Sequence, residues 1–166
     1  MSLILCPTRG GQSSIPNQQW AISQAKERNA KLVFLYISNV HFLDRSAGPL
    51  LVDISHELDE LGEFLLAMAQ DRAAKAGVEA QTIVRQGEFQ EALTTAIQEL
   101  GANTVVIGQA ARGTGVTTEQ YLTILADAVK KTGAELFVVD EGQVVHLHTP
   151  AAETHSGETD QTQPEP

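Results

Sequence analysis

The run Leu32-Val-Phe-Leu-Tyr-Ile37 decides the fold class of this chain. It is continuously apolar and rich in β-branched and aromatic residues, which is typical of a strand covered on both faces, as in a parallel sheet. Four further segments are predicted to be strands because they are short, apolar and bounded by turn residues: residues 3–6, 78–84, 104–107 and 135–139. The chain thus starts and ends its folded part on a strand.

The segments between the predicted strands have helical periodicity. Residues 14–29 begin with Ser14 as a candidate helix cap and Pro16 in the first turn, where a missing N–H costs little. Two later helices are predicted over residues 87–100 and 121–131. Residues 51–76 carry apolar side chains at three- and four-residue steps, which predicts one long helix with these inward residues: Leu51, Ile54, Leu58, Leu61, Leu65 and Met68.

Regular alternation of strands and helices predicts an α/β fold. Right-handed crossovers place helices on both faces of a parallel sheet, so we expect a five-stranded, doubly wound, flavodoxin- or Rossmann-like sheet between two helical layers. One α/β domain is expected over residues 1–140. If its last strand lies at the sheet edge, its unpaired backbone groups favour a homodimer through Glu135 to Asp140.

The charge of the chain is unevenly distributed. The 166 residues carry a formal net charge of −10, and residues 141–166 contain five acidic residues but no lysine or arginine. No large apolar side chain follows Leu147. Such a segment cannot bury enough surface to offset its ordering entropy, so residues 141–166 are predicted to be an acidic, disordered C-terminal tail.

Composition excludes several classes of partner and compartment. The single cysteine, Cys6, allows no disulfide within the chain and no cysteine-based zinc site. No apolar stretch approaches the ~20 residues of a membrane span, and the N-terminus lacks a secretory signal pattern, so we expect a cytoplasmic protein. The acidic balance disfavours binding to nucleic acid or to a membrane surface.

Two loops rich in Gly, Ser and Thr are unlike ordinary connections. Residues 7–14 and 108–118 each follow a predicted strand, contain one arginine and lead into a helix start, where backbone N–H groups favour anions. The alternative is that these residues only form turns and caps. The candidate ligand- or anion-binding residues are Thr8, Arg9, Gly10, Gly108, Arg112, Gly113, Thr114, Gly115 and Thr117.

Familiar phosphate motifs do not explain the second loop. Gly108 and Gly113 have the spacing of a P-loop start, but Thr114-Gly115 replaces the Lys-Ser/Thr pair that clamps the phosphate. A dinucleotide fingerprint fails as well, because Thr118 stands where its third glycine belongs.

Over residues 2–140 the order and spacing of these parts resemble the universal stress protein family. The resemblance rests on the opening Ile4-Leu-Cys-Pro-Thr-Arg-Gly10, the long helix over residues 63–77, Val105-Val-Ile-Gly108 and the closing Glu135-Leu-Phe-Val-Val139. It implies a stress-response or regulatory protein without catalytic activity. It also implies dimers that pair through the last strand, and ATP binding in members with the pattern Gly-x2-Gly-x9-Gly-Ser/Thr/Asn.

This chain departs from that ATP-binding pattern. Gly108 matches the first glycine, but Ala111 stands at the second, and Tyr121-Leu122 or Leu122-Thr123 stands at the last pair. Arg9 replaces an aspartate that contacts the nucleoside, and arginine can only donate hydrogen bonds. Three alternatives follow: no ligand, a nucleotide such as ATP or AMP held differently, or another anion held between Arg9 and Arg112.

Candidate catalytic and metal-binding groups are sparse. Cys6 is predicted to be a buried strand residue, and His146, His148 and His155 do not form a convincing metal site. No acid–base pair or nucleophile elbow is visible, so we expect a protein that is not an enzyme. The alternatives are a nucleotide or small-anion sensor, and a small nucleotide-hydrolysing enzyme, both at the crevice between the two loops.

Overall fold

A computed structural model describes residues 2–39, 48–109 and 119–150. One mixed sheet forms its centre, with the strand order β3-β2-β1-β4-β5-β6. The first five strands are parallel and β6 is antiparallel to β5. The strands are β1 (Leu3–Pro7), β2 (Lys31–Ser38), β3 (Ala80–Gln86), β4 (Thr104–Gly108), β5 (Glu135–Asp140) and β6 (Gln143–His148).

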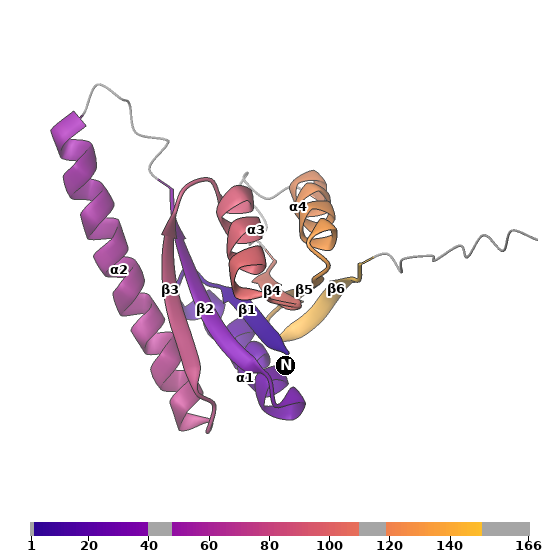
Figure 1. The fold of residues 1–166 in the computed structure, drawn as a ribbon. Helices are drawn as coiled ribbons and strands as arrows, with labels where there is room; N and C mark the ends of the chain where they lie inside the picture. The colour runs from indigo at the N-terminus through magenta and orange to yellow at the C-terminus, as the bar shows by residue number, and fades with distance from the viewer. Residues whose placement is uncertain (1, 40–47, 110–118, 151–166) are drawn as a thin grey trace, which may run out of the picture.

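Helices cover both faces of this sheet (Figure 1). α1 (Ile15–Arg28) follows a short 3-10 turn, η1 (Gln12–Ser14), and shares one face with α2 (Gly48–Lys75). α3 (Phe89–Leu100) and α4 (Glu119–Lys131) cover the other face. The predicted α/β fold with a doubly wound parallel sheet is therefore confirmed, although the sheet has six strands and not five.

The core consists of two apolar layers separated by the central strands. Ile4 and Cys6 of β1 face the α1/α2 layer, and Leu5 faces the α3/α4 layer. This alternation follows from the two-residue period of a strand. Cys6 is buried, as predicted, and its thiol belongs to the core.

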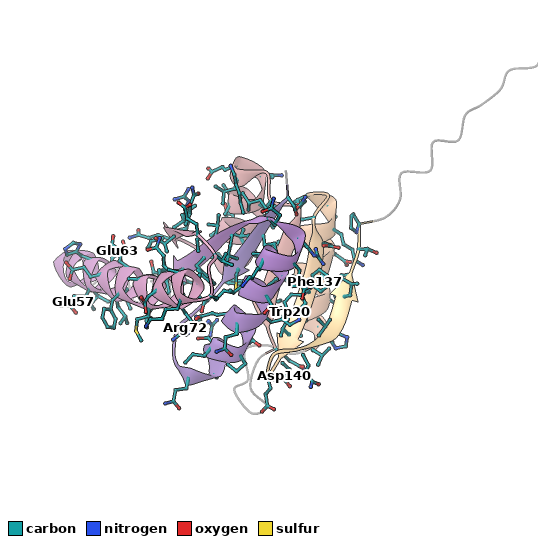
Figure 2. The ribbon with its side chains drawn as sticks, turned by 90° about the horizontal axis from the view of Figure 1, so that it is seen from below. Trp20, Glu57, Glu63, Arg72, Phe137 and Asp140 are labelled. Atoms are coloured by element: carbon teal, nitrogen blue, oxygen red, sulfur yellow. The ribbon has the colours of Figure 1, made fainter. Side chains whose placement is uncertain are left out.

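An aromatic contact joins α1 to β5 on the face of the sheet that α1 covers. The Trp20 ring lies 5.0 Å from the Phe137 ring of β5, centroid to centroid, and the Arg28 guanidinium lies over Phe137 at 5.3 Å. Figure 2 shows Trp20 and Phe137 side by side. Arg28 also forms an ion pair with Glu135 at 2.8 Å. These contacts fix α1 against β5 near its middle, at Trp20, and at its C-terminal end, at Arg28.

The predicted inward face of α2 is partly wrong. Leu61 and Met68 are exposed, while Leu66, Ala69 and Ala73 are buried. The apolar residues of α2 form two neighbouring stripes with the same spacing, so periodicity alone could not select between them. Small residues decide the choice, because Gly62 lies directly against the Tyr36 ring and lets the helix approach β2 closely.

The predicted domain boundary at residue 140 is also wrong. Glu141 and Gly142 have φ values of 49° and 79°, as in a two-residue hairpin turn, and Gln143–His148 returns along β5 as β6. β5 is therefore an inner strand, which contradicts its expected place at the edge. The remainder of the predicted tail, residues 151–166, lies outside the described residues.

Candidate functional site

The sheet reverses its winding direction between β1 and β4. These strands are neighbours, and their connections leave toward opposite edges of the sheet. Ligands of open α/β sheets bind at this switch point, outside the carboxyl ends of the strands. Of the predicted site residues, Thr8, Arg9 and Gly10 follow β1, and Gly108 ends β4. Five others lie outside the described residues: Arg112, Gly113, Thr114, Gly115 and Thr117.

Thr8 is buried and lies at the centre of a polar network. Its Oγ1 accepts hydrogen bonds from Gln18 Nε2 at 2.7 Å and from the Gly10 N–H at 3.3 Å. Both lone pairs of the hydroxyl oxygen are thus engaged, so the group that Thr8 retains for a ligand is its hydroxyl hydrogen.

Gln18 connects this network to α2. Its side chain is buried, and its Oε1 accepts a hydrogen bond from Arg72 Nη1. Arg72 lies on α2 at the side that faces α1 (Figure 2). Neither residue was predicted from the sequence, because α1 contains more polar than apolar side chains and no local pattern distinguishes Gln18 from its neighbours.

Gly10 owes its identity to backbone geometry and close packing. Its φ is 75°, and a Cβ there would lie 2.5 Å from Leu65 Cδ2 of α2. The open side of this glycine therefore faces α2. At Gly10 the simpler interpretation, that glycine forms a turn, explains the residue without a ligand.

Arg9 is exposed, and its positive charge influences the titration of Tyr121 on α4. Burial raises the pKa of Tyr121 on α4, the carboxylate of Glu88 raises it further, and the Arg9 guanidinium opposes this rise. Glu88 itself caps α3, because its carboxylate accepts hydrogen bonds from the Gln90 and Glu91 N–H groups. Arg9 thus supplies positive charge at the carboxyl end of the sheet.

Gly108 lies directly beneath the side chain of Asn17. A Cβ at Gly108 would lie 2.6 Å from Asn17 Nδ2, so any larger residue there would displace that amide. Asn17 Oδ1 is buried and has no hydrogen-bond partner among the described residues. Asn17 was not predicted from the sequence, although it lies in the first turn of the helix that follows the first loop.

Ser14 does not cap α1 as predicted. It occupies the N-cap position, but its hydroxyl donates to the Gly11 carbonyl at 2.7 Å and bonds no backbone N–H of the helix. The preceding 3-10 turn brings the Gly11 carbonyl within reach of this hydroxyl. Ser14 Oγ also accepts a bond from Gln18 Nε2 at 3.3 Å, which joins it to the Thr8 network.

Other candidate chemistry is weaker within the described part of the chain. Burial raises the pKa of Cys6 to about 12, so its thiol is protonated and unreactive at neutral pH. His146 and His148 lie on β6 with ring centroids 6.3 Å apart, and residues 2–39, 48–109 and 119–150 contain no group of three metal-ligating side chains. No helix among the same residues is long and apolar enough to cross a membrane.

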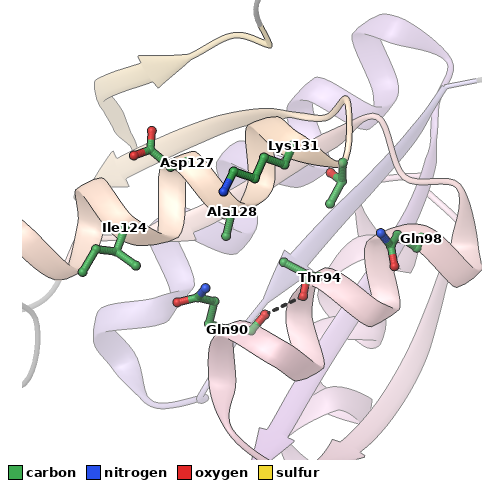
Figure 3. Close-up of a pocket in the computed structure, with 8 residues that line it drawn as sticks. Gln90, Thr94, Gln98, Ile124, Asp127, Ala128 and Lys131 are labelled. Carbon is green, nitrogen blue, oxygen red and sulfur yellow. Dashed lines mark hydrogen bonds between the residues drawn. The ribbon is translucent and has the colours of Figure 1, made fainter.

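A surface depression between α3 and α4 lies apart from the switch point (Figure 3). It has a volume of about 420 Å³, and Gln90, Thr94 and Lys131 are among its lining residues. Thr94 Oγ1 donates to the Gln90 carbonyl at 2.9 Å and is therefore already satisfied. The depression is shallow and mixes polar with apolar groups, so it does not resemble a built ligand site.

Comparison with known proteins identifies the family. A model of the universal stress protein family matches residues 1–116. The chain belongs to the universal stress protein family. A comparison with curated proteins gave no significant match.

Solved structures of universal stress proteins share the fold. A family member from Burkholderia pseudomallei is 23% identical, with a TM-score of 0.61, over 84% of this chain and 96% of its own. UspA from Lactobacillus plantarum is 13% identical with a TM-score of 0.69, over 83% and 97%. A family protein from Arabidopsis thaliana with AMP bound is 10% identical with a TM-score of 0.55, over 84% and 91%.

Proposed function

We propose that this universal stress protein is a non-catalytic stress-response regulator of the cytoplasm that binds a nucleoside monophosphate at the β1/β4 switch point. The observation that carries the proposal is that two hydrogen-bond donors follow each other at the end of β1: the buried hydroxyl of Thr8 and the exposed guanidinium of Arg9. A phosphate group accepts hydrogen bonds from both, and the bond from arginine is charge-assisted. The AMP bound to the Arabidopsis thaliana protein supports this choice of ligand.

AMP is a better candidate ligand than ATP, because this chain lacks glycines that the family's ATP-binding pattern contains. The last glycine position of that pattern falls on Tyr121 or Leu122, and both side chains pack against the α3/α4 core. A large side chain blocks the close approach of a phosphate to the backbone, which glycine permits. A monophosphate needs fewer such approaches than a triphosphate.

Calorimetric titration with AMP, ATP and sulfate tests the proposal. We expect saturable AMP binding that Arg9→Ala weakens about tenfold, with Arg85→Ala as the matched control, because Arg85 lies on β3 and pairs with Glu99. Absence of AMP binding to the wild-type protein would contradict the proposed ligand. Magnesium-dependent phosphate release from ATP or AMP would instead support the hydrolase alternative.

We also propose a homodimer, paired through β6 in place of β5. β6 is the outer strand on that side of the sheet, and Val144, Val145 and Leu147 are all more than 40% exposed. Two copies of such an edge can pair antiparallel about a twofold axis, because that arrangement is self-complementary.

A further inference from the structure

The side-chain amide of Asn17 is the unusual polar group of the switch point. It lies in the first turn of α1, where the residue is partly exposed, and its Oδ1 is buried without a hydrogen-bond partner in the part of the chain that the structure describes. Buried polar atoms are nearly always satisfied, because an unpaired one loses its bonds to water without replacement. An unpaired amide oxygen therefore needs an explanation.

The next residue shows that the fold can satisfy amides in this turn. Gln18 donates to Thr8 and Ser14 and accepts from Arg72, so both ends of its side chain are engaged. Asn17 points elsewhere, onto the bare backbone of Gly108 at the end of β4. The glycine makes room for an amide whose oxygen forms no hydrogen bond with the described part of the chain.

Three described groups near Asn17 either donate hydrogen bonds or are already engaged. The Thr8 oxygen accepts two bonds, Arg9 has only donors, and the Gln109 N–H is bound to the Val139 carbonyl at 2.8 Å. Asn17 Oδ1 is thus an unused hydrogen-bond acceptor that lies near the hydrogen-bond donors of Thr8 and Arg9. A ligand that matches both needs an anionic group and a hydrogen-bond donor.

We propose that Asn17 is a specificity-determining residue, whose Oδ1 accepts a hydrogen bond from a ligand N–H or O–H and so selects a nucleoside phosphate over an inorganic anion. A ribose hydroxyl or a base amino group supplies that donor, whereas sulfate offers only acceptor oxygens. The inference rests on the proposed function and adds the feature that distinguishes these two ligand classes.

Calorimetry on the full chain with AMP and with sulfate tests this assignment, using Asn17→Leu and Asn17→Ala. We expect AMP binding to weaken about tenfold in both variants, with sulfate binding unchanged. Equal AMP affinity in wild type and variants would overturn the role of Asn17 while leaving the proposed function intact. A wild-type protein that binds no AMP would overturn both.

Thermal unfolding without ligand separates a binding role from a structural one. Asn17→Leu removes no hydrogen bond of Oδ1, so its melting temperature should equal or exceed that of the wild type. Gln18→Ala is the matched control and should melt at a lower temperature, because it breaks the Thr8–Arg72 network. An equal loss in both variants would assign Asn17 to the fold and overturn the proposal.

Discussion

Burial fixes the chemistry of Cys6. The residue lies in β1, where its backbone pairs with Phe34 of β2, and its side chain is enclosed by the α1/α2 layer. Desolvation disfavours the thiolate, which raises the pKa of the thiol from 9.0 to about 12. A cysteine near a helix start and an arginine thus behaves as an apolar core residue.

The raised pKa of Cys6 predicts a loss of stability in alkali. Above pH 9 the unfolded thiol loses its proton while the folded thiol keeps it, so the free energy of unfolding falls by about 1.4 kcal/mol per pH unit up to about pH 12. Urea unfolding of wild type and Cys6→Ala at pH 8, 9.5 and 10.5 isolates this contribution. Parallel pH dependences of the two proteins would contradict it.

At the scale of elements, α2 is held by polar contacts at the carboxyl ends of β2 and β3. Asp59 Oδ1 accepts a hydrogen bond from the buried Ser38 hydroxyl at 2.8 Å, and Oδ2 accepts one from Gln86 Nε2. Beyond this point the N-terminal part of α2 extends past the sheet (Figure 1). Asp59 therefore holds the N-terminal part of α2 against the sheet, whereas the buried apolar residues of α2 lie further along the helix.

Asp59→Ala is expected to lower the free energy of unfolding by about 1–3 kcal/mol, because it leaves the Ser38 hydroxyl buried without a partner. Chemical denaturation measures the change, and hydrogen exchange should increase first in the N-terminal part of α2. Glu60→Ala is the control, since Glu60 is exposed and forms an ion pair with the likewise exposed His56. Equal losses in both variants would show that the Ser38 contact is not the cause.

The elements also show what the sequence could and could not predict. Strands and helices were predictable because their apolar periods are local. The inward face of α2 was not, because it depends on how closely Gly62 approaches Tyr36 in another element. β6 was missed because its side chains are mostly exposed, so composition made Gln143–His148 look like a tail.

The location of the candidate site could be predicted from the sequence, but several of the residues that form it could not. Gly-rich loops after the first and fourth strands pointed to the switch point, and Thr8 and Gly108 lie there. The roles of Asn17, Gln18 and Arg72 depend on contacts between α1, α2 and β4 that no local pattern encodes. Gly10 was predicted for a ligand, yet its packing against Leu65 explains it.

For the whole molecule, the two outer strands decide how copies can associate. β3 lies beside α2, whereas β6 has exposed side chains along almost all of its length. Gln143–His148 contains no lysine, arginine, proline or acidic residue, which are the residues that protect exposed strand edges. The β6 edge is therefore the better candidate for pairing with a second copy.

Light scattering with size-exclusion chromatography tests that dimer. We expect the wild-type chain to run at twice its mass of 17.8 kDa and Val145→Lys at the mass of one chain, because it places a positive charge on the β6 edge of both copies and the two edges then repel each other. Gln81→Lys places the same charge on β3 and should leave the dimer intact. A wild-type mass of 17.8 kDa, or equal effects of both lysines, would contradict pairing through β6.

The position of β6 in the chain has a consequence for synthesis. On the ribosome, β1 gains its second neighbour only after Thr104–Gly108 has emerged, because β4 pairs with it across a long sequence separation. β5 then remains an open edge until Gln143–His148 leaves the exit tunnel. A chain released after Asp140 would present that edge, and with it a template for aggregation, which β6 covers in the full chain.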